Sequence, residues 1–107
     1  GLTQEDLHVS YPEGPVQPGG AIDKLMDQFP NLYGDLSSSG AHAMLRDREF
    51  GQEFLVRRAD RLLFGTDYYD LTQHEFQQFS LFDAFNLPSD VQRKISRENS
   101  RRLLGLV

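Results

Sequence analysis

The chain has 107 residues, with 16 acidic and 11 basic side chains and a formal net charge of −5. This length allows one ordinary domain, and the acidic balance excludes the cationic surface that duplex nucleic acid requires, so we expect no nucleic-acid partner. The absence of cysteine excludes disulfides and thiolate metal sites and favours a cytoplasmic protein, and no apolar run approaches the ~20 residues of a membrane span, so we expect no membrane partner.

Residues 1–20 are predicted to form a long surface loop, because they are rich in proline and glycine, which resist regular structure. An amphipathic helix follows. Its apolar residues Ile22, Leu25, Met26 and Phe29 are spaced i, i+3, i+4, i+7 and therefore share one helical stripe. We expect this stripe to face the core.

A strand and two helices are predicted next. Pro30 ends the first helix, and residues 32–36 form a plausible strand. The serine-rich turn at 37–40 can cap a short helix that reaches Leu45. A further amphipathic helix is expected over 48–59.

The helix over 48–59 is predicted to bury Phe50, Phe54 and Leu55 on one face, and Glu53 lies four residues before Arg57, the spacing of a helical ion pair. Three arginines gather near its end, at 57, 58 and 61, and nearby acidic residues balance them. These acidic residues are Asp47, Glu53 and Asp60. A solvated helix face explains this cluster better than a binding patch.

The apolar run over 62–64 predicts a buried strand, with Asp67 just beyond its carboxyl end. The succession helix, strand, helix, strand is typical of parallel βα units. Ligands and catalytic groups collect at the carboxyl ends of parallel strands, which makes Asp67 a candidate site residue. The alternative is an aspartate that hydrogen-bonds its own turn.

The last third of the chain is predicted to be helical. Residues 72–75 have the form of a capping box before four phenylalanines at i+3 steps, which we expect to form a core stripe. These are Phe76, Phe79, Phe82 and Phe85. A second capping pattern runs from Ser89 to Gln92, with Val91 and Ile95 on the buried face, and a short helix is expected over 99–104.

In this order the motifs resemble the carboxyl end of the amidohydrolase-2 family, whose members are metal-dependent hydrolases and decarboxylases built on a (β/α)₈ TIM barrel. Pro30–Ser37 is similar to the family's seventh strand, Asp67 falls where the eighth strand ends, and Ile95–Leu106 is similar to the end of the family's domain. The resemblance covers residues 11–106. A complete barrel needs about 250 residues.

The resemblance therefore implies an α/β fold that is a C-terminal fragment of a (β/α)₈ barrel, with about two parallel strands and flanking helices. The whole chain, residues 1–107, would be one partial domain: a loop over 1–20, then the last βα units and C-terminal helices over 21–107. The missing N-terminal part of the barrel would be its main partner. Homo-oligomerisation stays open.

The resemblance also implies a role for Asp67 as both metal ligand and catalytic general base. It would help to hold a divalent metal ion, with Zn²⁺ as the first candidate, and would activate the attacking water toward a small-molecule substrate. The family takes its other ligands from a His-x-His on the first strand and from histidines on the fifth and sixth strands, and this sequence contains no His-x-His. We expect the isolated chain to be inactive.

None of the chain's three histidines is assigned as a metal ligand. His8 is expected to be solvated, and His74 is expected to be structural. His42 is interpreted as a helix-surface histidine, with contact to substrate as the alternative. Asp35 is expected to be buried in its strand and to need a polar partner.

The serines at 37–39 and the tyrosine pair at 68–69 each have two possible roles. The hydroxyls of residues 37–39 are expected to cap the following helix, with a place in the pocket wall as the alternative. Tyr68 and Tyr69 either wall the pocket or pack against the next helix.

Two functions follow. The first is a fragment of a metal-dependent hydrolase that uses metal-activated water to cleave C–N or C–O bonds, or that decarboxylates a related substrate. The second is a non-catalytic α/β binding or interaction module. The sequence leaves open the substrate, the metal and the choice between hydrolase and decarboxylase.

Overall fold

The computed structural model describes residues 1–106, so Val107, which the predicted domain includes, lies outside the described residues. Six α-helices, two strands, two 3₁₀ turns and one π-helical turn follow one another within this range. In chain order they are η1 (Asp6–His8), α1 (Ala21–Gln28), β1 (Gly34–Asp35), α2 (Gly40–Leu45), α3 (Arg48–Arg57), η2 (Ala59–Arg61), β2 (Leu62–Leu63), α4 (Gln77–Ala84), α5 (Ser89–Arg93), η3 (Lys94–Glu98) and α6 (Asn99–Leu103).

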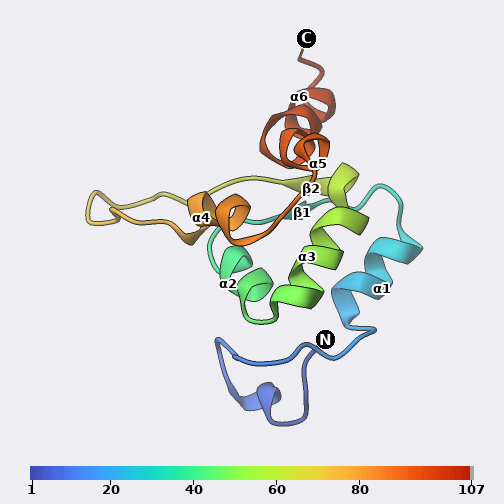
Figure 1. The fold of residues 1–107 in the computed structure, drawn as a ribbon, viewed down its shortest axis with the longest axis vertical. Coiled ribbons are helices and arrows are strands. Elements are labelled where there is room, and N and C mark those ends of the chain that lie inside the picture. The colour runs from blue at the N-terminus through green and yellow to red at the C-terminus, as the bar shows by residue number, and fades with distance from the viewer. Residues whose placement is uncertain (107) are drawn as a thin grey trace.

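The two strands pair in parallel, with Gly34 opposite Leu62 and Asp35 opposite Leu63. The prediction of two parallel strands with flanking helices is therefore confirmed, although each strand spans only two residues. Figure 1 shows α1, α2 and α3 on one side of the strand pair and α5 to α6 on the other. The loop between β2 and α4 projects away from this body.

The core lies between the strands and the helices on both sides of them. It is made of aliphatic and aromatic side chains from helices α1 to α5, the strand β2 and the segments between them, namely Met26, Leu36, Ala41, Phe54, Leu55, Ala59, Leu62, Leu81, Phe85, Leu87, Val91 and Ile95. Phe50 packs partly buried against it, as predicted for the apolar face of α3. Burial of this apolar surface is the main force that holds the short strands together.

The predicted helix α1 forms, but its apolar stripe does not face the core. Met26 is buried, whereas Ile22 and Phe29 are 61% and 47% exposed and Leu25 is also exposed. The expectation of a buried stripe is therefore wrong for three of its four residues. Beside this helix lies an open apolar cavity of about 580 Å³, whose lining includes Ile22, Met26 and Leu32.

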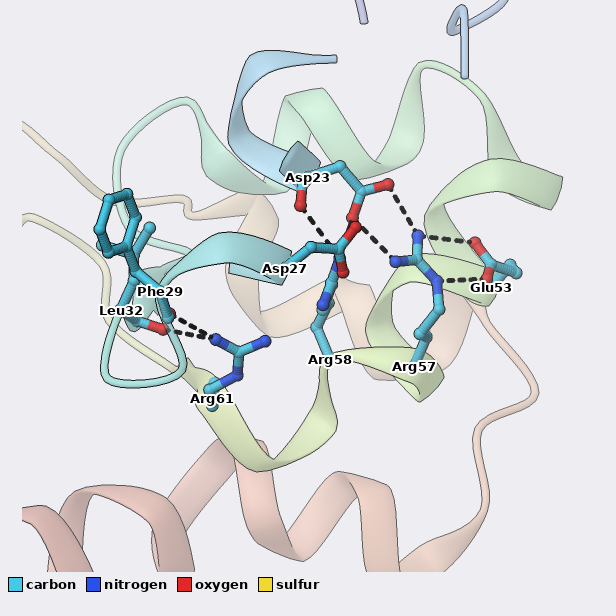
Figure 2. A network of polar contacts seen from close by, with 8 residues as sticks. All are labelled: Asp23, Asp27, Phe29, Leu32, Glu53, Arg57, Arg58 and Arg61. Carbon is cyan, nitrogen blue, oxygen red and sulfur yellow. Dashed lines mark hydrogen bonds and ion pairs between the residues drawn. The ribbon is translucent and has the colours of Figure 1, made fainter. Parts of the chain in front are cut away.

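Besides the buried Met26, ion pairs hold α1 against α3 (Figure 2). The Arg58 side chain is only 7% exposed and donates to Asp23 at 2.7 Å and to Asp27 at 2.6 Å. Arg57 donates to Asp23 at 2.8 Å and to Glu53 at 2.6 Å, which confirms the predicted i, i+4 pair. The Arg57 guanidinium, with Arg58 beside it, lowers the pKa of Asp23 from 3.8 to about 2.

The expectation of a solvated arginine face is therefore wrong, because α1 supplies two carboxylates that the sequence pattern did not connect to it. Arg61 donates to the carbonyls of Phe29 and Leu32, at 3.0 and 3.4 Å, and so fixes the turn between α1 and β1 (Figure 2). Of the acidic residues expected to balance the arginines, Asp60 instead pairs with Lys94 at 2.9 Å.

The expected phenylalanine stripe of α4 is only partly buried. Phe85 lies in the core and Phe82 packs against it, but Phe79 is exposed. The buried positions of this helix are Gln78 and Leu81, followed by Phe85 at its end. The Phe79 ring contacts the Phe64 ring, with 5.6 Å between the ring centroids. Phe64 also contacts Phe82, at 6.1 Å.

Neither predicted capping box forms. Helix α4 begins after Phe76, without a side-chain cap. The side-chain oxygen Oε1 of Gln73 accepts hydrogen bonds from the backbone N–H groups of Tyr69 and Asp70, at 2.9 and 3.2 Å. Gln73 therefore closes a turn in the projecting loop. At α5, Pro88 rather than a serine occupies the cap position.

The C-terminal helices α5, η3 and α6 run on as one rod with a π-helical turn in its middle. Val91 and Ile95 are buried, as predicted. The fully buried Asn99 donates to the carbonyls of Ala59 and Leu62, at 2.6 and 2.8 Å, and so ties this rod to the start of β2. Across residues 1–106, no helix has both the length and the apolar character to cross a membrane.

Candidate functional site

A cavity of about 380 Å³ lies where the chain leaves the carboxyl ends of both strands. Its walls come from the turn after β1, the turn after β2, helix α2, the segment that leads into α4, and the N-terminal loop. They are made of Tyr11, Ser38, Ser39, His42, Thr66, Asp67, Tyr69, Gln73, Glu75, Phe76, Gln77 and Gln78. Asp67, the predicted site residue, therefore lies beside residues that follow the neighbouring strand.

Asp67 and Ser38 share an uncommon backbone conformation. Their φ angles are +58° and +53°, and they are the only non-glycine residues with positive φ in the described part of the chain. The left-handed region costs an L-residue roughly 1–2 kcal/mol, and aspartate is among the residues that tolerate it best. Strain of this kind gathers at ligand sites, so its occurrence at both strand ends supports a functional role for this cavity.

The two strand ends approach each other closely. A Cβ added at Gly65 would lie 3.1 Å from the Asp35 carboxylate and 3.3 Å from the Ser37 side chain, so this position favours glycine. Asp35 is exposed rather than buried, which corrects the expectation of a buried carboxylate. Its partner is local: the carboxylate accepts a hydrogen bond from the backbone N–H of Ser37, two residues later, at 2.9 Å.

Gln78 of α4 fixes the turn after β1. Its amide nitrogen donates to the carbonyls of Leu36 and Ser38, at 3.1 and 2.7 Å, and the residue is only 2% exposed. This residue was not singled out from the sequence, where only the phenylalanines of this helix were expected to be buried. Its i, i+3, i+7 spacing with Leu81 and Phe85 is the signal that could have found it.

Of the three histidines, only His42 lines the cavity, whereas His8 and His74 are exposed. The Nε2 atom of His42 is buried and has no hydrogen-bond partner in residues 1–106. The Tyr11 ring meets the imidazole edge-on, with 6.2 Å between ring centroids and 88° between planes. His42 is therefore a partly exposed residue of helix α2, as the helix-surface interpretation expected, and it also lines the cavity.

Two of the three serines at 37–39 and one of the two tyrosines at 68–69 line the cavity. The side chain of Ser39, at the start of α2, makes no capping hydrogen bond, so the expected cap is wrong there, and Ser38 and Ser39 instead line the cavity. Tyr69 also lines the cavity, while Tyr68 packs against the ring of Phe76, with 6.0 Å between centroids.

The loop that carries Tyr11 is fixed to the residues that follow α2. Arg46 donates to the carbonyls of Gly14 and Pro15, at 2.9 and 3.1 Å, and pairs with Asp6 at 3.0 Å. The backbone of Thr3 and then Arg46 lower the pKa of Asp6 by hydrogen bonding to its carboxylate.

Asp47 adds a second attachment for this loop, because it accepts a hydrogen bond from the Val16 backbone at 2.9 Å while its other oxygen caps α3 at Phe50. These two backbone donors, that of Val16 first, lower the pKa of Asp47. Neither Arg46 nor Asp47 was predicted from the sequence to contact this loop.

The donors for a metal ion are few. No three His, Cys, Asp or Glu side chains within residues 1–106 lie close enough to hold one. Asp67 and Glu75 are the two carboxylates in the cavity wall. Asp67 is exposed and lines this cavity.

In a comparison with protein families, the family model described as Amidohydrolase matches residues 17–106. The chain belongs to the amidohydrolase family. The resemblance predicted from the strand-end motifs is thereby confirmed, with a start at residue 17 rather than 11. No curated protein and no solved structure matches the chain. Membership in this family supports assignment to the hydrolases, and amidohydrolases generally use divalent metals.

Proposed function

We propose that the chain is a C-terminal fragment of a (β/α)₈ barrel in a metal-dependent hydrolase, with Asp67 as metal ligand and general base. The substrate would be a small molecule with a C–N or C–O bond to be cleaved. The observation that carries the proposal is the position of Asp67 at the mouth of a cavity beyond two parallel strands, beside the turn that follows the neighbouring strand. Catalytic groups of barrel enzymes lie at this end of their strands.

Asp67 is suited to this role by its chemistry. A carboxylate can bind a divalent cation through one oxygen and accept a proton from water through the other. When bound, a divalent ion would supply Lewis-acid activation of water. Zn²⁺ is our first candidate, since catalytic zinc sites take about three protein ligands.

The described residues fit one ligand of such a set. The others would come from the preceding part of the barrel, which is the main partner that we propose. Decarboxylation of a related substrate by the same site stays a second possibility for the reaction.

The exposed apolar residues of α1 and the apolar cavity beside them favour a fragment over the alternative of a self-standing binding module. A module that folds alone would be expected to bury this surface. We therefore propose the hydrolase fragment as the function.

The test is Asp67→Asn in the complete barrel protein that contains this chain, with Asp83→Asn as the control. Asp83 is an exposed aspartate of α4 outside the cavity, so the two variants change the same charge. Asparagine tolerates a left-handed backbone, so Asp67→Asn should keep the fold.

We expect Asp67→Asn to lower bound zinc, measured by elemental analysis, and to lower turnover by about 10²–10⁴-fold. Asp83→Asn should leave both unchanged. Retention of zinc and of most activity in Asp67→Asn would refute the assignment.

A further inference from the structure

Two surfaces of the described chain expose apolar side chains. The first is the projecting loop between β2 and α4, where Leu71 is 84% exposed and Tyr69 is also exposed. The second is the end of the C-terminal rod, where Leu104 is 70% exposed and lies between the exposed residues Leu103 and Leu106. Apolar side chains that gather on a surface mark a place that a partner covers.

The two surfaces carry charges of opposite sign. The stretch 62–92 contains no lysine or arginine, and the projecting loop presents the exposed carboxylates of Asp67, Asp70 and Glu75. The C-terminal rod instead concentrates cationic side chains, which are Arg93, Lys94, Arg97, Arg101 and Arg102. An acidic apolar surface and a basic apolar surface therefore lie on the same chain.

Part of the positive charge of the rod has no partner of opposite sign. Arg93 and Lys94 form ion pairs with carboxylates of the same molecule. Within residues 1–106, Arg97 and Arg101 form none. Arg101 lies about one helical turn after Arg97 and one turn before Leu104, so positive charge and exposed apolar surface meet on the rod.

Hydrogen bonds hold the tip of the projecting loop in one conformation. The Gln73 side chain accepts from the backbone of Tyr69 and Asp70, and the Asp70 carboxylate accepts from the Thr72 backbone N–H at 3.0 Å. The backbone carbonyl of Asp70 also accepts from Gln73, at 3.0 Å. Leu71 is thus presented by a closed turn.

The end of the rod is held in the same way. The backbone N–H of Leu106 donates to the carbonyl of Arg101 at 2.8 Å, that of Gly105 donates to Arg102 at 3.2 Å, and Gly105 has a φ of +69°. These are the two hydrogen bonds and the left-handed glycine of a Schellman cap. Surfaces that are already ordered lose less conformational entropy when a partner covers them.

The complementary surface that each one needs is present on a second copy of the chain. Figure 1 shows the loop and the C-terminal rod extending from different sides of the body, and within residues 1–106 no ion pair joins them. Two copies related by a two-fold axis make each contact twice, because the loop of either copy meets the rod of the other.

We propose that the chain forms a two-fold dimer in which the projecting loop of each copy docks on the C-terminal rod of the other. Leu71 would pack against Leu104 and its neighbouring leucines. Arg97 and Arg101 would face the carboxylates of the loop. This inference goes beyond the proposed hydrolase and does not depend on its chemistry.

The test is sedimentation of the complete protein that contains this chain, over a wide range of concentration and of NaCl. We expect a dimer whose Kd rises with salt, because salt screens the charges of the two surfaces. A protein that stays monomeric up to its highest soluble concentration would overturn the proposal.

Single variants locate the contact. Leu71→Asp, Leu104→Asp and Arg101→Glu should each raise the Kd of the dimer by about tenfold or more. The controls make the same changes at exposed positions elsewhere, as Leu7→Asp in η1 and Lys24→Glu in α1, and should leave the Kd unchanged. A dimer that Leu71→Asp and Leu104→Asp leave intact would refute the assigned surfaces.

A mixture of two variants distinguishes this contact from the other symmetric arrangements. Leu71→Asp keeps an intact rod and Leu104→Asp keeps an intact loop, so together they restore one of the two contacts. We expect fluorescently labelled Leu71→Asp to sediment as a heterodimer with Leu104→Asp at concentrations where each variant alone is monomeric. Absence of the heterodimer would indicate a contact of loop with loop or of rod with rod, and would contradict the proposal.

The preceding part of the barrel is the other occupant that could cover the leucines of the rod. In that case Leu104→Asp would lower the melting temperature at concentrations where the parent protein is monomeric, and would leave the Kd unchanged. This outcome would also overturn the proposal. Neither measurement involves zinc or turnover, so failure of the dimer and failure of the role of Asp67 are separate results.

Discussion

Asp23→Asn should be one of the most destabilising single charge removals in this chain. The Asp23 carboxylate accepts from Arg57 at 2.8 and 2.9 Å and from Arg58 at 3.1 and 2.7 Å, and its side chain is 16% exposed. The lowering of its pKa from 3.8 to about 2 corresponds to about 2 kcal/mol of preferential stabilisation of the charged form in the folded state. Loss of that charge also leaves Arg58 buried with one exposed partner, and broken buried pairs cost about 3–5 kcal/mol.

We therefore expect Asp23→Asn to lower the free energy of unfolding by about 2–4 kcal/mol. The matched control is Asp27→Asn, which removes the same charge one helical turn later, from a carboxylate that also contacts Arg58 but is 71% exposed. That change should cost less than about 1 kcal/mol. Urea unfolding at neutral pH measures both values. Equal losses in the two variants, or a loss below about 1 kcal/mol for Asp23→Asn, would refute the conclusion that burial makes the Asp23 pair strong.

Three further predictions concern pH, a polar bridge and a strained turn. Because the pKa of Asp23 is lowered on folding, the stabilisation that its carboxylate supplies is present in full above pH 3.8 and is lost as the pH falls toward about 2. In Asp23→Asn the free energy of unfolding should therefore depend less on pH across that window than in the parent protein. An unchanged pH dependence would contradict this prediction. Gln78→Met removes the donor to the carbonyls of Leu36 and Ser38 and should lower the free energy of unfolding by about 1–3 kcal/mol, measured in urea. The control Gln77→Met, at the neighbouring exposed position, should lower it by less than about 0.5 kcal/mol. Similar losses in both variants would show that the Gln78 hydrogen bonds contribute little. Ser38 has a left-handed backbone conformation, which glycine adopts without a steric penalty. Ser38→Gly should therefore raise the free energy of unfolding by about 0.5 kcal/mol, after the greater entropy of glycine in the unfolded chain is subtracted. A marked loss of stability would show that the serine side chain matters more than the backbone conformation.

Sequence periodicity located the helices, but for α1 and α4 it did not identify which side is buried. The phenylalanines of α4 illustrate the reason. At about 100° per residue, steps of three residues rotate each ring back by about 60°, so four such rings spread over about half of the helix surface. Gln78, Leu81 and Phe85 lie within about 60° of one another, and these are the buried positions.

Long-range polar contacts were the other feature that the sequence could not reveal. Arg58 and Asp23 are 35 residues apart, and Asn99 is 37 residues from Leu62, whose carbonyl it binds. Local spacing did predict the pair of Glu53 with Arg57, because both lie on one helix. The parallel order of the strands was also predictable, since it follows from the alternation of helices and strands along the chain.

The position of the candidate site was predictable for a physical reason that does not depend on the side chains around it. Parallel strands bring their carboxyl ends to one edge, so a polar residue just after a buried strand must lie near whatever follows the neighbouring strand. Asp67 satisfies this condition, and the cavity joins it to the turn at Ser38. His42 comes from the helix after that turn, which the strand order places at the same edge, and its local sequence gives no sign of a buried nitrogen. A search for site residues in such chains should therefore include the first turn of the helix after each strand as well as the strand end itself.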